Sequence, residues 1–213
     1  MTSTDLAGMR EEYMSRRLDE RDAAHEPIAQ FHAWFDEAVK AKLPMVNAMT
    51  LATASSKRRP AARMVLLKGL DARGFVFYTD YQSRKARELE ENPRAALLFY
   101  WIELEREVRI EGAVERATAD EAEAYFATRP VGSRLAALAS TQSSVIPDRE
   151  SLERRYAEIE REHADAPPRP STWGGYRVIP DSIEFWQGRA NRLHDRVLYT
   201  RSGGRWTIVR LSP

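Results

Sequence analysis

The segment A-M-T-L-A-T-A-S-S-K-R-R-P-A-A-R-M-V-L-L-K-G-L-D-A-R-G-F-V-F-Y-T, residues 48–79, contains three short apolar runs that are rich in strand-forming residues. Turn-like sequences separate these runs at Ser55–Lys57 and Asp71–Gly74. The pattern predicts three strands joined by tight turns, at Ala48–Ala54, Ala61–Leu70 and Gly74–Thr79.

The following segment continues this pattern. Arg94–Trp101 and Arg106–Arg116 predict two more strands, and Ser83–Glu91 predicts a helix that ends at Asn92-Pro93. About five strands with one inserted helix lack the strand–helix alternation of a doubly wound parallel sheet. The order therefore favours an antiparallel barrel within a mainly β fold with flanking helices.

Helical segments flank these strands in the sequence. Pro27 suits the first position of a helix, and apolar residues at helical spacing extend this helix to about Lys42. Further helices are expected at Asp120–Thr128, Ser133–Ala139 and Arg149–His163, followed by a stiff linker at Pro167–Pro170. The last expected strands are Tyr176–Ile179, Ile183–Gln187, His194–Thr200 and Trp206–Leu211, with a hairpin turn at Ser202–Gly204.

Composition excludes several classes of protein. The 213 residues carry a formal net charge of +1, which argues against a nucleic-acid-binding module. There is no cysteine, and the four histidines lack the spacing of metal ligands, so we expect no metal site. No apolar run approaches the ~20 residues that span a bilayer, and no signal-peptide core is present. We therefore expect a cytoplasmic protein with no membrane partner.

A charged motif, R-L-H-D-R, occupies residues 192–196. Extended from Asn191 onward, it would place Arg192, His194 and Arg196 on one face of a sheet. Two guanidinium groups and an imidazole suit an anionic, aromatic ligand. A solvated edge strand is the alternative, but the preceding aromatic pair Phe185-Trp186 favours a binding site.

A second candidate site lies where the strand ending at Thr79 leads into a helix. Ser83 is expected to cap this helix, and Arg84 and Lys85 fall in its first turn. Cations are unfavourable at a helix N-terminus, so this pair implies a counter-anion such as a ligand phosphate. A solvated helix start is the alternative.

A third candidate site combines a tyrosine and an arginine. Tyr125 and Arg129 are four residues apart on one helix face, and Pro130 predicts a break after them. Ser133 is then expected to cap the next helix, so that a hydroxyl, a guanidinium and a helix start converge on a small anion. A plain helix–break–helix is the alternative.

Eight motifs in register resemble the pyridoxamine 5'-phosphate oxidases, a family of flavoproteins, from about Arg10 to Pro213. They are R-M-V-L-L-K (63–68), F-Y-T (77–79), S-R-K (83–85), R-P-x-x-S (129–133), Q-S-S (142–144), W-G-G (173–175), E-F-W-Q-G (184–188) and R-L-H-D-R (192–196). The resemblance implies an FMN-binding split β-barrel that forms a homodimer. It implies a mobile N-terminal arm or lid (1–25), an FMN-binding core with helices (26–170) and C-terminal strands that complete the active site and dimer interface (171–213).

The resemblance also assigns roles by position. Arg192 and His194 would contact the substrate ring and act in catalysis, and Arg10 and Tyr13 would close over the substrate. The substrate phosphate would meet Lys68, Tyr125, Arg129 and Ser133. FMN would be held by Arg63, Met64, Val65, Leu66, Leu67, Lys68, Tyr78, Thr79, Ser83, Arg84, Lys85, Glu107, Gln142, Ser143, Trp186 and Arg196.

The implied reaction oxidises pyridoxamine or pyridoxine 5'-phosphate to pyridoxal 5'-phosphate. Oxygen would be the acceptor, hydrogen peroxide would be released, and the amine would also yield ammonia. A phenazine-pathway oxidase of the same fold is one alternative, and the Tyr125/Arg129/Ser133 set argues against it. A flavin- or heme-binding barrel without catalytic activity is another, and such a protein has little need for the R-L-H-D-R motif.

Glu107 departs from the family pattern, which has glutamine at this position. An amide can donate a hydrogen bond to a flavin carbonyl, whereas an ionised carboxylate can only accept. We expect Glu107 to be held neutral, to turn toward an arginine such as Arg63 or Arg106, or to lower the flavin potential.

Overall fold

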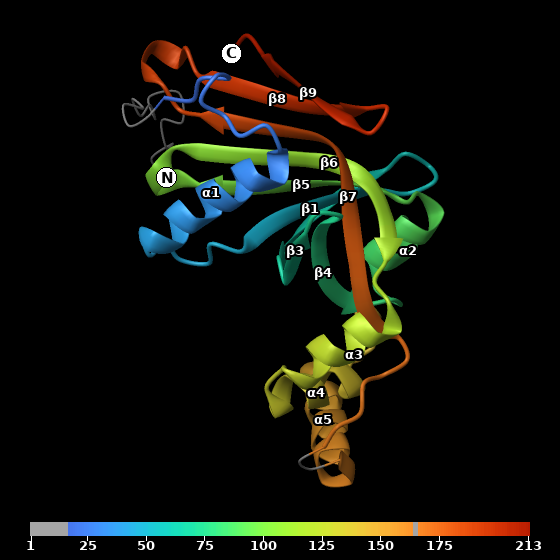
Figure 1. Cartoon of the computed structure of the whole chain (residues 1–213). Helices are drawn as coiled ribbons and strands as arrows, with labels where there is room; N and C mark the ends of the chain where they lie inside the picture. Colours follow the sequence, from blue (N-terminus) through green and yellow to red (C-terminus); the bar gives the residue numbers. More distant parts are fainter. Residues whose placement is uncertain (1–16, 164–165) are drawn as a thin grey trace, which may run out of the picture. The chain divides into compact units, whose positions relative to one another are not determined.

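The computed structural model describes residues 17–163 and 166–213, and the chain is mainly β with flanking helices, as predicted (Figure 1). None of the described helices is both long and apolar enough to cross a membrane. The helices are α1 (Pro27–Lys40), α2 (Arg84–Glu91), α3 (Ala119–Ala127), α4 (Val131–Ala139) and α5 (Arg149–His163). The strands are β1 (Ala48–Ala54), β2 (Pro60–Leu66), β3 (Gly69–Asp71), β4 (Gly74–Asp80), β5 (Arg94–Trp101), β6 (Arg106–Arg116), β7 (Trp173–Gln187), β8 (Asp195–Ser202) and β9 (Arg205–Arg210).

The strands pair in the order β2-β1-β5-β6-β7-β4-β3, with β8 beside β7 and β9 beside β8. The pairs β1–β2, β3–β4, β4–β7, β7–β8 and β8–β9 are all antiparallel. Gly203 and Gly204 connect β8 to β9 with φ values of 57° and 79°. Two positive φ angles are what a two-residue hairpin turn requires, so the predicted hairpin is confirmed.

The chain divides into two compact units. Within the described residues, the first contains the segment up to Val46 together with Leu98–Ile110 and Asp181–Pro213. The second contains Asn47–Leu97 and Glu111–Pro180. Strands β5, β6 and β7 therefore contribute residues to both units, whereas α2, α3, α4 and α5 belong to the second.

Aromatic packing forms the core of the first unit. Helix α1 places Phe31 against Phe99, with ring centroids 4.9 Å apart, and Trp34 against Phe185 at 5.3 Å. The guanidinium of the buried Arg106 lies 4.2 Å from the Trp34 ring centroid. The apolar spacing that predicted this helix thus corresponds to its buried face.

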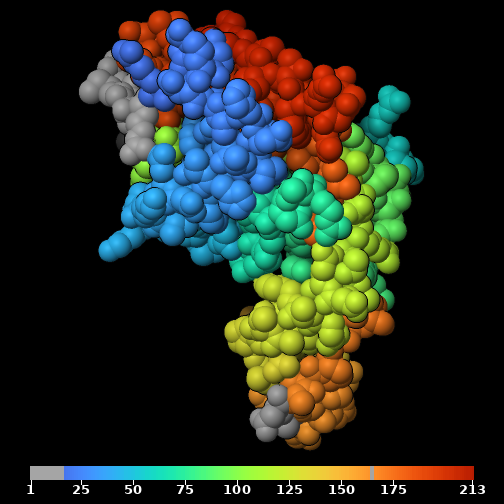
Figure 2. Space-filling model, viewed as in Figure 1, coloured from blue at the N-terminus to red at the C-terminus, as the bar shows by residue number. Residues whose placement is uncertain are grey.

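Helices and a buried strand organise the second unit. Strand β4 is buried along nearly its whole length, between β3 and β7. Helix α3 starts with a capping box, in which Thr118 Oγ1 accepts from the Glu121 N–H and the Glu121 carboxylate accepts from the Thr118 N–H. Helices α4 and α5 pack against each other, as the yellow-green and orange surfaces show (Figure 2).

The single strand expected at Ala61–Leu70 is in fact two strands, β2 and β3. The chain changes its hydrogen-bond partner between them: Leu67 N–H donates to Asn47 O at 2.8 Å, and Lys68 N–H donates to Val76 O at 2.8 Å. One run of apolar residues therefore forms two strands, which belong to the pairs β1–β2 and β3–β4. Composition alone does not indicate where one strand ends and the next begins.

The two strands expected at Tyr176–Ile179 and Ile183–Gln187 form one continuous strand, β7. Its pairing with β4 ends at Val178, and its pairing with β8 begins at Ser182. Pro180 lies between these two ladders, so its missing N–H removes no hydrogen bond from either of them. A proline, which normally argues against a strand, therefore leaves the ladders to β4 and β8 intact.

The prediction of an extended strand from Asn191 onward was wrong. Ala190–Arg192 form a short 3-10 turn in which Asn191 and Arg192 have φ values of 57° and 60°, and strand β8 begins only at Asp195. Asparagine adopts this left-handed region more readily than most residues, which explains the turn. The alternation that would group Arg192 with His194 and Arg196 therefore does not exist.

Gly112 in β6 is a position where a side chain has no room. A Cβ atom there would lie 2.0 Å from Ile179 O and 2.7 Å from Ile179 C, both backbone atoms of β7. We expect Gly112→Ala to lower the free energy of unfolding by about 3 kcal/mol, the upper range for overpacking, measured by urea denaturation. As the control, Gly132→Ala in α4 should leave it unchanged or raise it by up to about 1 kcal/mol, because alanine favours helix. Equal effects of the two substitutions would contradict this reading of the β6–β7 contact.

Candidate functional site

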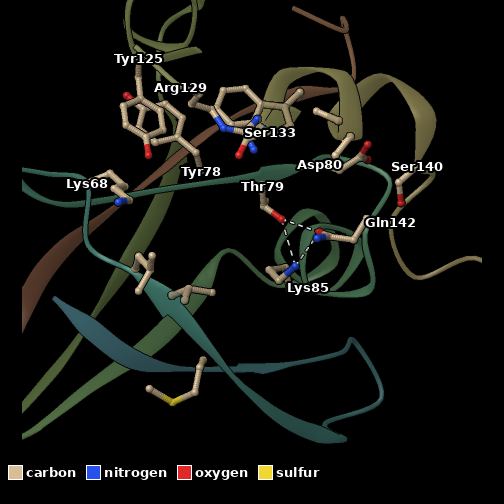
Figure 3. A pocket seen from close by; sticks show the side chains of 16 residues that line it. Lys68, Tyr78, Thr79, Asp80, Lys85, Tyr125, Arg129, Ser133, Ser140 and Gln142 are labelled. Carbon is tan, nitrogen blue, oxygen red and sulfur yellow. Dashed lines mark hydrogen bonds between the residues drawn. The ribbon is translucent and has the colours of Figure 1, made fainter. Parts of the chain in front are cut away.

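A pocket of about 520 Å³ lies within the second unit, and ten of its side chains are labelled in Figure 3. Lys68 and Tyr125 lie on the side of the pocket away from Lys85 and Gln142 (Figure 3). The lining residues are Met64, Val65, Leu66, Lys68, Tyr78, Thr79, Asp80, Lys85, Tyr125, Arg129, Ser133, Ala136, Ala137, Ser140, Gln142 and Trp173. The pocket thus combines an apolar strand, β2, with cations at separate places.

Lys85 provides one positively charged part of the pocket lining. Its Nζ donates to Thr79 Oγ1 at 3.0 Å and to Gln142 Oε1 at 2.8 Å (dashed lines, Figure 3). Burial, with the nearby charge of Arg63 as a smaller cause, lowers the pKa of Lys85 to about 8. Within residues 17–163 and 166–213, no carboxylate pairs with this ammonium group. The predicted cap is present, because Ser83 Oγ accepts from the Ala86 N–H at 3.4 Å.

Arg129 forms the second cationic place, just beyond the end of α3. Its guanidinium carbon lies 4.8 Å from the Trp173 ring centroid and 5.5 Å from that of Phe126. Burial lowers the pKa of Arg129, and its Nη1 is buried without a hydrogen-bond partner among the described residues. An unsatisfied buried N–H costs about 1–3 kcal/mol, so an anionic ligand would be stabilised here.

Ser133 lines the pocket but does not cap α4 as predicted. The helix begins at Val131 with Pro130 in the cap position, and the Ser133 N–H already donates to Pro130 O at 2.9 Å. Pro130 therefore starts the helix two residues earlier than the sequence indicated, since its fixed φ is compatible with a helix start. The Ser133 hydroxyl faces a pocket that also contains Tyr125 and Arg129.

The three arginines predicted to hold FMN, Arg63, Arg84 and Arg196, do not line the pocket. Arg63 Nη2 lies 3.0 Å from Glu88 Oε2, and Arg84 Nε lies 2.8 Å from Glu88 Oε1. Ser143, with a φ of 71°, accepts from the backbone N–H of Arg84 at 3.2 Å. Leu67 and the capping serine are also absent from the lining, so the structure places these residues around the pocket rather than in it.

The R-L-H-D-R motif belongs to the first unit. The backbone N–H of Arg189 donates to His194 Nδ1 at 3.1 Å, which leaves the proton of the neutral imidazole on Nε2. Burial and the charge of Arg192 lower the pKa of His194, which favours that neutral form. The rings of Trp186 and His194 lie 4.5 Å apart, and Arg192 is exposed.

Glu107 turns toward an arginine, which was one of the expected outcomes, but this arginine is Arg109 and not Arg63 or Arg106. Arg109 Nε lies 3.5 Å from Glu107 Oε1, while Arg106 pairs with Glu37 at 2.9 Å. Burial raises the pKa of Glu107, with Arg109 acting in the opposite direction. The prediction that the environment favours the neutral carboxyl therefore agrees with the direction of this shift.

Glu184 pairs with Arg196, which was predicted to hold FMN, and also with Arg109, the partner of Glu107. Arg196 Nε lies 2.7 Å from Glu184 Oε1, and Arg109 Nη2 also pairs with Glu184. These hydrogen bonds keep the pKa of Glu184 below its usual range although burial acts to raise it. The motif E-F-W-Q-G contained Glu184, but its role as a partner of Arg196 was not predicted.

Five residues that line the pocket were not predicted from the sequence. Trp173 belongs to the W-G-G motif but was assigned no role, and small residues give little signal of their own. Arg10 and Tyr13 lie outside the described residues. The missed lining residues are Asp80, Ala136, Ala137, Ser140 and Trp173.

Comparisons with known proteins agree with the motifs. Residues 35–162 match the family model described as pyridoxamine 5'-phosphate oxidase, and residues 173–213 match the pyridoxine 5'-phosphate oxidase C-terminal dimerisation region. A pyridoxine/pyridoxamine 5'-phosphate oxidase of Burkholderia lata is 58% identical over 213 residues, 99% of this chain and 100% of the relative. One of Paraburkholderia phymatum is 59% identical over 209 residues, 98% of this chain and 99% of the relative.

Solved structures support the fold. PhzG from Burkholderia lata 383, in complex with tetrahydrophenazine-1-carboxylic acid, matches with a TM-score of 0.90 and 33% identity, over 95% of this chain and 100% of that one. A pyridoxamine 5'-phosphate oxidase-related, FMN binding protein from Nostoc punctiforme matches with a TM-score of 0.68 and 18% identity, over 86% and 97%. The second likeness shows the fold alone, and together they confirm the predicted split β-barrel.

Proposed function

Because this chain belongs to the pyridoxamine 5'-phosphate oxidase family, we propose that it oxidises pyridoxamine and pyridoxine 5'-phosphate to pyridoxal 5'-phosphate. FMN is the proposed cofactor and oxygen the acceptor, with release of hydrogen peroxide and, from the amine, of ammonia. Both the cofactor and the substrate are flat heterocycles that carry a phosphate, so the protein must hold two anionic groups.

One observation carries this proposal: a single pocket contains two half-buried cations, Lys85 and Arg129, that pair with no carboxylate among the described residues. Arginine presents planar donors that match a phosphate, and a lysine ammonium is a compact phosphate ligand. Lys68, Tyr125 and Ser133 add an ammonium and two hydroxyls to the same pocket. These are donors for organic phosphates, whereas a purely apolar ligand would leave them unsatisfied.

The residues present fit FMN. Lys85, Thr79 and Gln142 would hold its phosphate, and the apolar side chains of β2 would contact its ring, with Tyr78 beside them. Arg63, Arg84 and Ser143 would act from positions around the pocket. Bound FMN would accept a hydride from the substrate, which is the redox chemistry that the side chains themselves lack.

The protein's own contribution is binding and proton placement. Lys68, Tyr125, Arg129 and Ser133 would hold the substrate phosphate. His194, neutral and protonated on Nε2, would donate a hydrogen bond from that atom to the substrate ring.

A His194 that becomes protonated at low pH would repel the cationic amine substrate. The kcat/KM for that substrate should therefore fall as the pH drops through the pKa of His194.

We also propose a homodimer in which residues 171–213 complete the active site. The match to a C-terminal dimerisation region supports this. Met64 supports it as well, because this pocket-lining methionine is 62% exposed although it is apolar. A partner subunit over β2 would remove such a side chain from water.

The test is the absorption spectrum and turnover of the purified protein. A two-banded flavin spectrum that bleaches anaerobically with pyridoxamine 5'-phosphate, and peroxide formation in air, are the expected results. The similarity to PhzG makes a reduced phenazine carboxylic acid the competing substrate. Turnover of that compound without turnover of pyridoxine 5'-phosphate would overturn the proposal, as would a protein that binds flavin and oxidises neither.

Glu107→Gln should raise the flavin midpoint potential and tighten flavin binding. At a pH at which the half-buried Glu107 is ionised, its carboxylate disfavours the negative charge of reduced flavin, whereas the glutamine amide would donate a hydrogen bond. We expect a shift of about +30 mV or more, which for two electrons corresponds to ~1.4 kcal/mol. Redox titration and equilibrium dialysis measure the two quantities. Values identical to those of the parent would remove Glu107 from the flavin environment.

A further inference from the structure

The indole of Trp173 lies beside the rings of Tyr78 and Tyr125 and close to the guanidinium of Arg129. Its indole, at the start of β7, is nearly parallel to the ring of Tyr78, with centroids 5.4 Å apart and 5° between planes. The ring of Tyr125 lies 6.1 Å away at 13°. The 4.8 Å from Arg129 Cζ to the indole centroid is well within the range of a cation–π interaction.

Arg129 is held by rings rather than by an acid. Trp173 and Phe126 are the two rings near its guanidinium, and no carboxylate pairs with it among residues 17–163 and 166–213. An aromatic face attracts the cation without accepting its N–H groups in the plane of the guanidinium. The rings therefore leave these donors unsatisfied: Nη1 is buried without a hydrogen-bond partner among the described residues, and Arg129 lines the pocket.

The backbone around Trp173 is fixed on both sides. Arg169 Nη1 donates to Trp173 O at 2.7 Å, and Arg169 Nε pairs with Glu123 on α3 at 2.9 Å. On the other side, a Cβ on Gly175 would lie 2.8 Å from Tyr78 Cε1, so only glycine lets that ring lie flat beside the strand. The W-G-G motif therefore places the indole at a defined position against α3.

We propose that Trp173 is a positioning residue that orients Arg129 for the substrate phosphate and so selects phosphorylated substrates. This inference rests on the proposed function, which requires two anion sites. Trp173 is proposed to orient the arginine of one of them, the site for the substrate phosphate. The indole does not touch the phosphate in this scheme. Its effect passes through Arg129, and it should disappear when Arg129 is absent.

The test compares phosphorylated and unphosphorylated ligands on the FMN-loaded protein. Trp173→Leu should raise the KM for pyridoxine 5'-phosphate and the Kd for pyridoxal 5'-phosphate at least tenfold, with kcat within threefold. The KM for pyridoxine and the Kd for pyridoxal should stay within twofold. Trp173→Phe, which keeps an aromatic face, should give an intermediate change and also covers the case in which the leucine variant does not fold.

Two controls separate positioning from a general structural effect. Phe77→Leu removes another fully buried ring of the same unit, which stacks on Tyr176 at 5.8 Å, and should leave the ratio of the two Kd values unchanged. In an Arg129→Ala background, Trp173→Leu should add less than a twofold change. Equal losses for both ligand classes, or an undiminished loss without Arg129, would overturn the inference. A parent that binds pyridoxal 5'-phosphate more tightly than pyridoxal but oxidises no pyridoxine 5'-phosphate would instead refute the proposed function.

Discussion

Lys85→Met is expected to raise the Kd for FMN about 100-fold while leaving the Kd for riboflavin within threefold. The ammonium group is half-buried beside Thr79 and Gln142 and has no carboxylate partner among the described residues, so a phosphate dianion would be its natural counter-charge. Removing one partner of a desolvated charge pair costs roughly 2–5 kcal/mol, and ~2.7 kcal/mol corresponds to 100-fold. Methionine preserves most of the apolar stem, so packing changes little.

Fluorescence titration of the apoprotein with the two flavins measures both constants. Lys57→Met is the matched control, because Lys57 is exposed in the turn between β1 and β2 and should leave both constants unchanged. If Lys85→Met weakened FMN and riboflavin equally, the lysine would support the flavin ring or the fold rather than the phosphate.

The same lysine predicts how FMN affinity depends on pH. The second pKa of a phosphate monoester is about 6, so FMN is a dianion from pH 7 upward. Lys85, with a pKa of about 8 in the free protein, is charged below that pH and loses its proton above it. FMN affinity should therefore be constant between pH 7 and 8 and then fall, by up to tenfold per pH unit. Isothermal titration at several pH values measures this, and Lys85→Met should abolish the fall. An affinity that stays constant to pH 10 in the parent would contradict the assignment.

The sequence predicted those elements in which local signals and tertiary structure agree. Pro27 begins α1, Ser83 caps α2, and two glycines form the last hairpin. Each of these residues acts through its own backbone geometry or the nearest N–H groups, so neighbours in the sequence suffice to predict the outcome.

The errors arose where a distant segment decides the structure. Leu67 and Lys68 end one strand pair and begin another because Asn47 and Val76 supply the acceptors. Pro180 lies within a strand at the point where the pairing with β4 has ended and the pairing with β8 has not yet begun. Neither partner can be identified from the residues nearby.

The candidate site also contains some residues that local patterns predicted and others whose roles depend on distant segments. Lys85, Tyr125 and Arg129 were predicted from the charge and spacing of their own segments, and the structure brings them into one pocket. Trp173 and Glu184 were not predicted as partners of arginines, because a tryptophan or a glutamate in a strand is equally consistent with core packing or a solvated face. Their roles depend on contacts with Arg129, just after α3, and with Arg196 in β8, which no local pattern specifies.

Arg192→Ala is expected to lower kcat/KM for pyridoxine 5'-phosphate by about 30-fold or more without changing stability. The side chain is exposed, and the residue lies in the turn before β8 with a φ of 60°. Exposed substitutions usually change the free energy of unfolding by less than about 0.5 kcal/mol, so the fold should tolerate the change. A guanidinium that becomes desolvated against the substrate should nevertheless contribute at least ~2 kcal/mol to its binding or turnover.

Steady-state peroxide assays and urea denaturation measure these two quantities. Arg192→Lys should recover only part of the activity, because an ammonium group keeps the charge but not the planar pair of donors. Arg205→Ala is the matched control: this arginine is exposed in the same unit and is expected to leave both quantities unchanged. Parental kcat/KM in Arg192→Ala would remove Arg192 from catalysis.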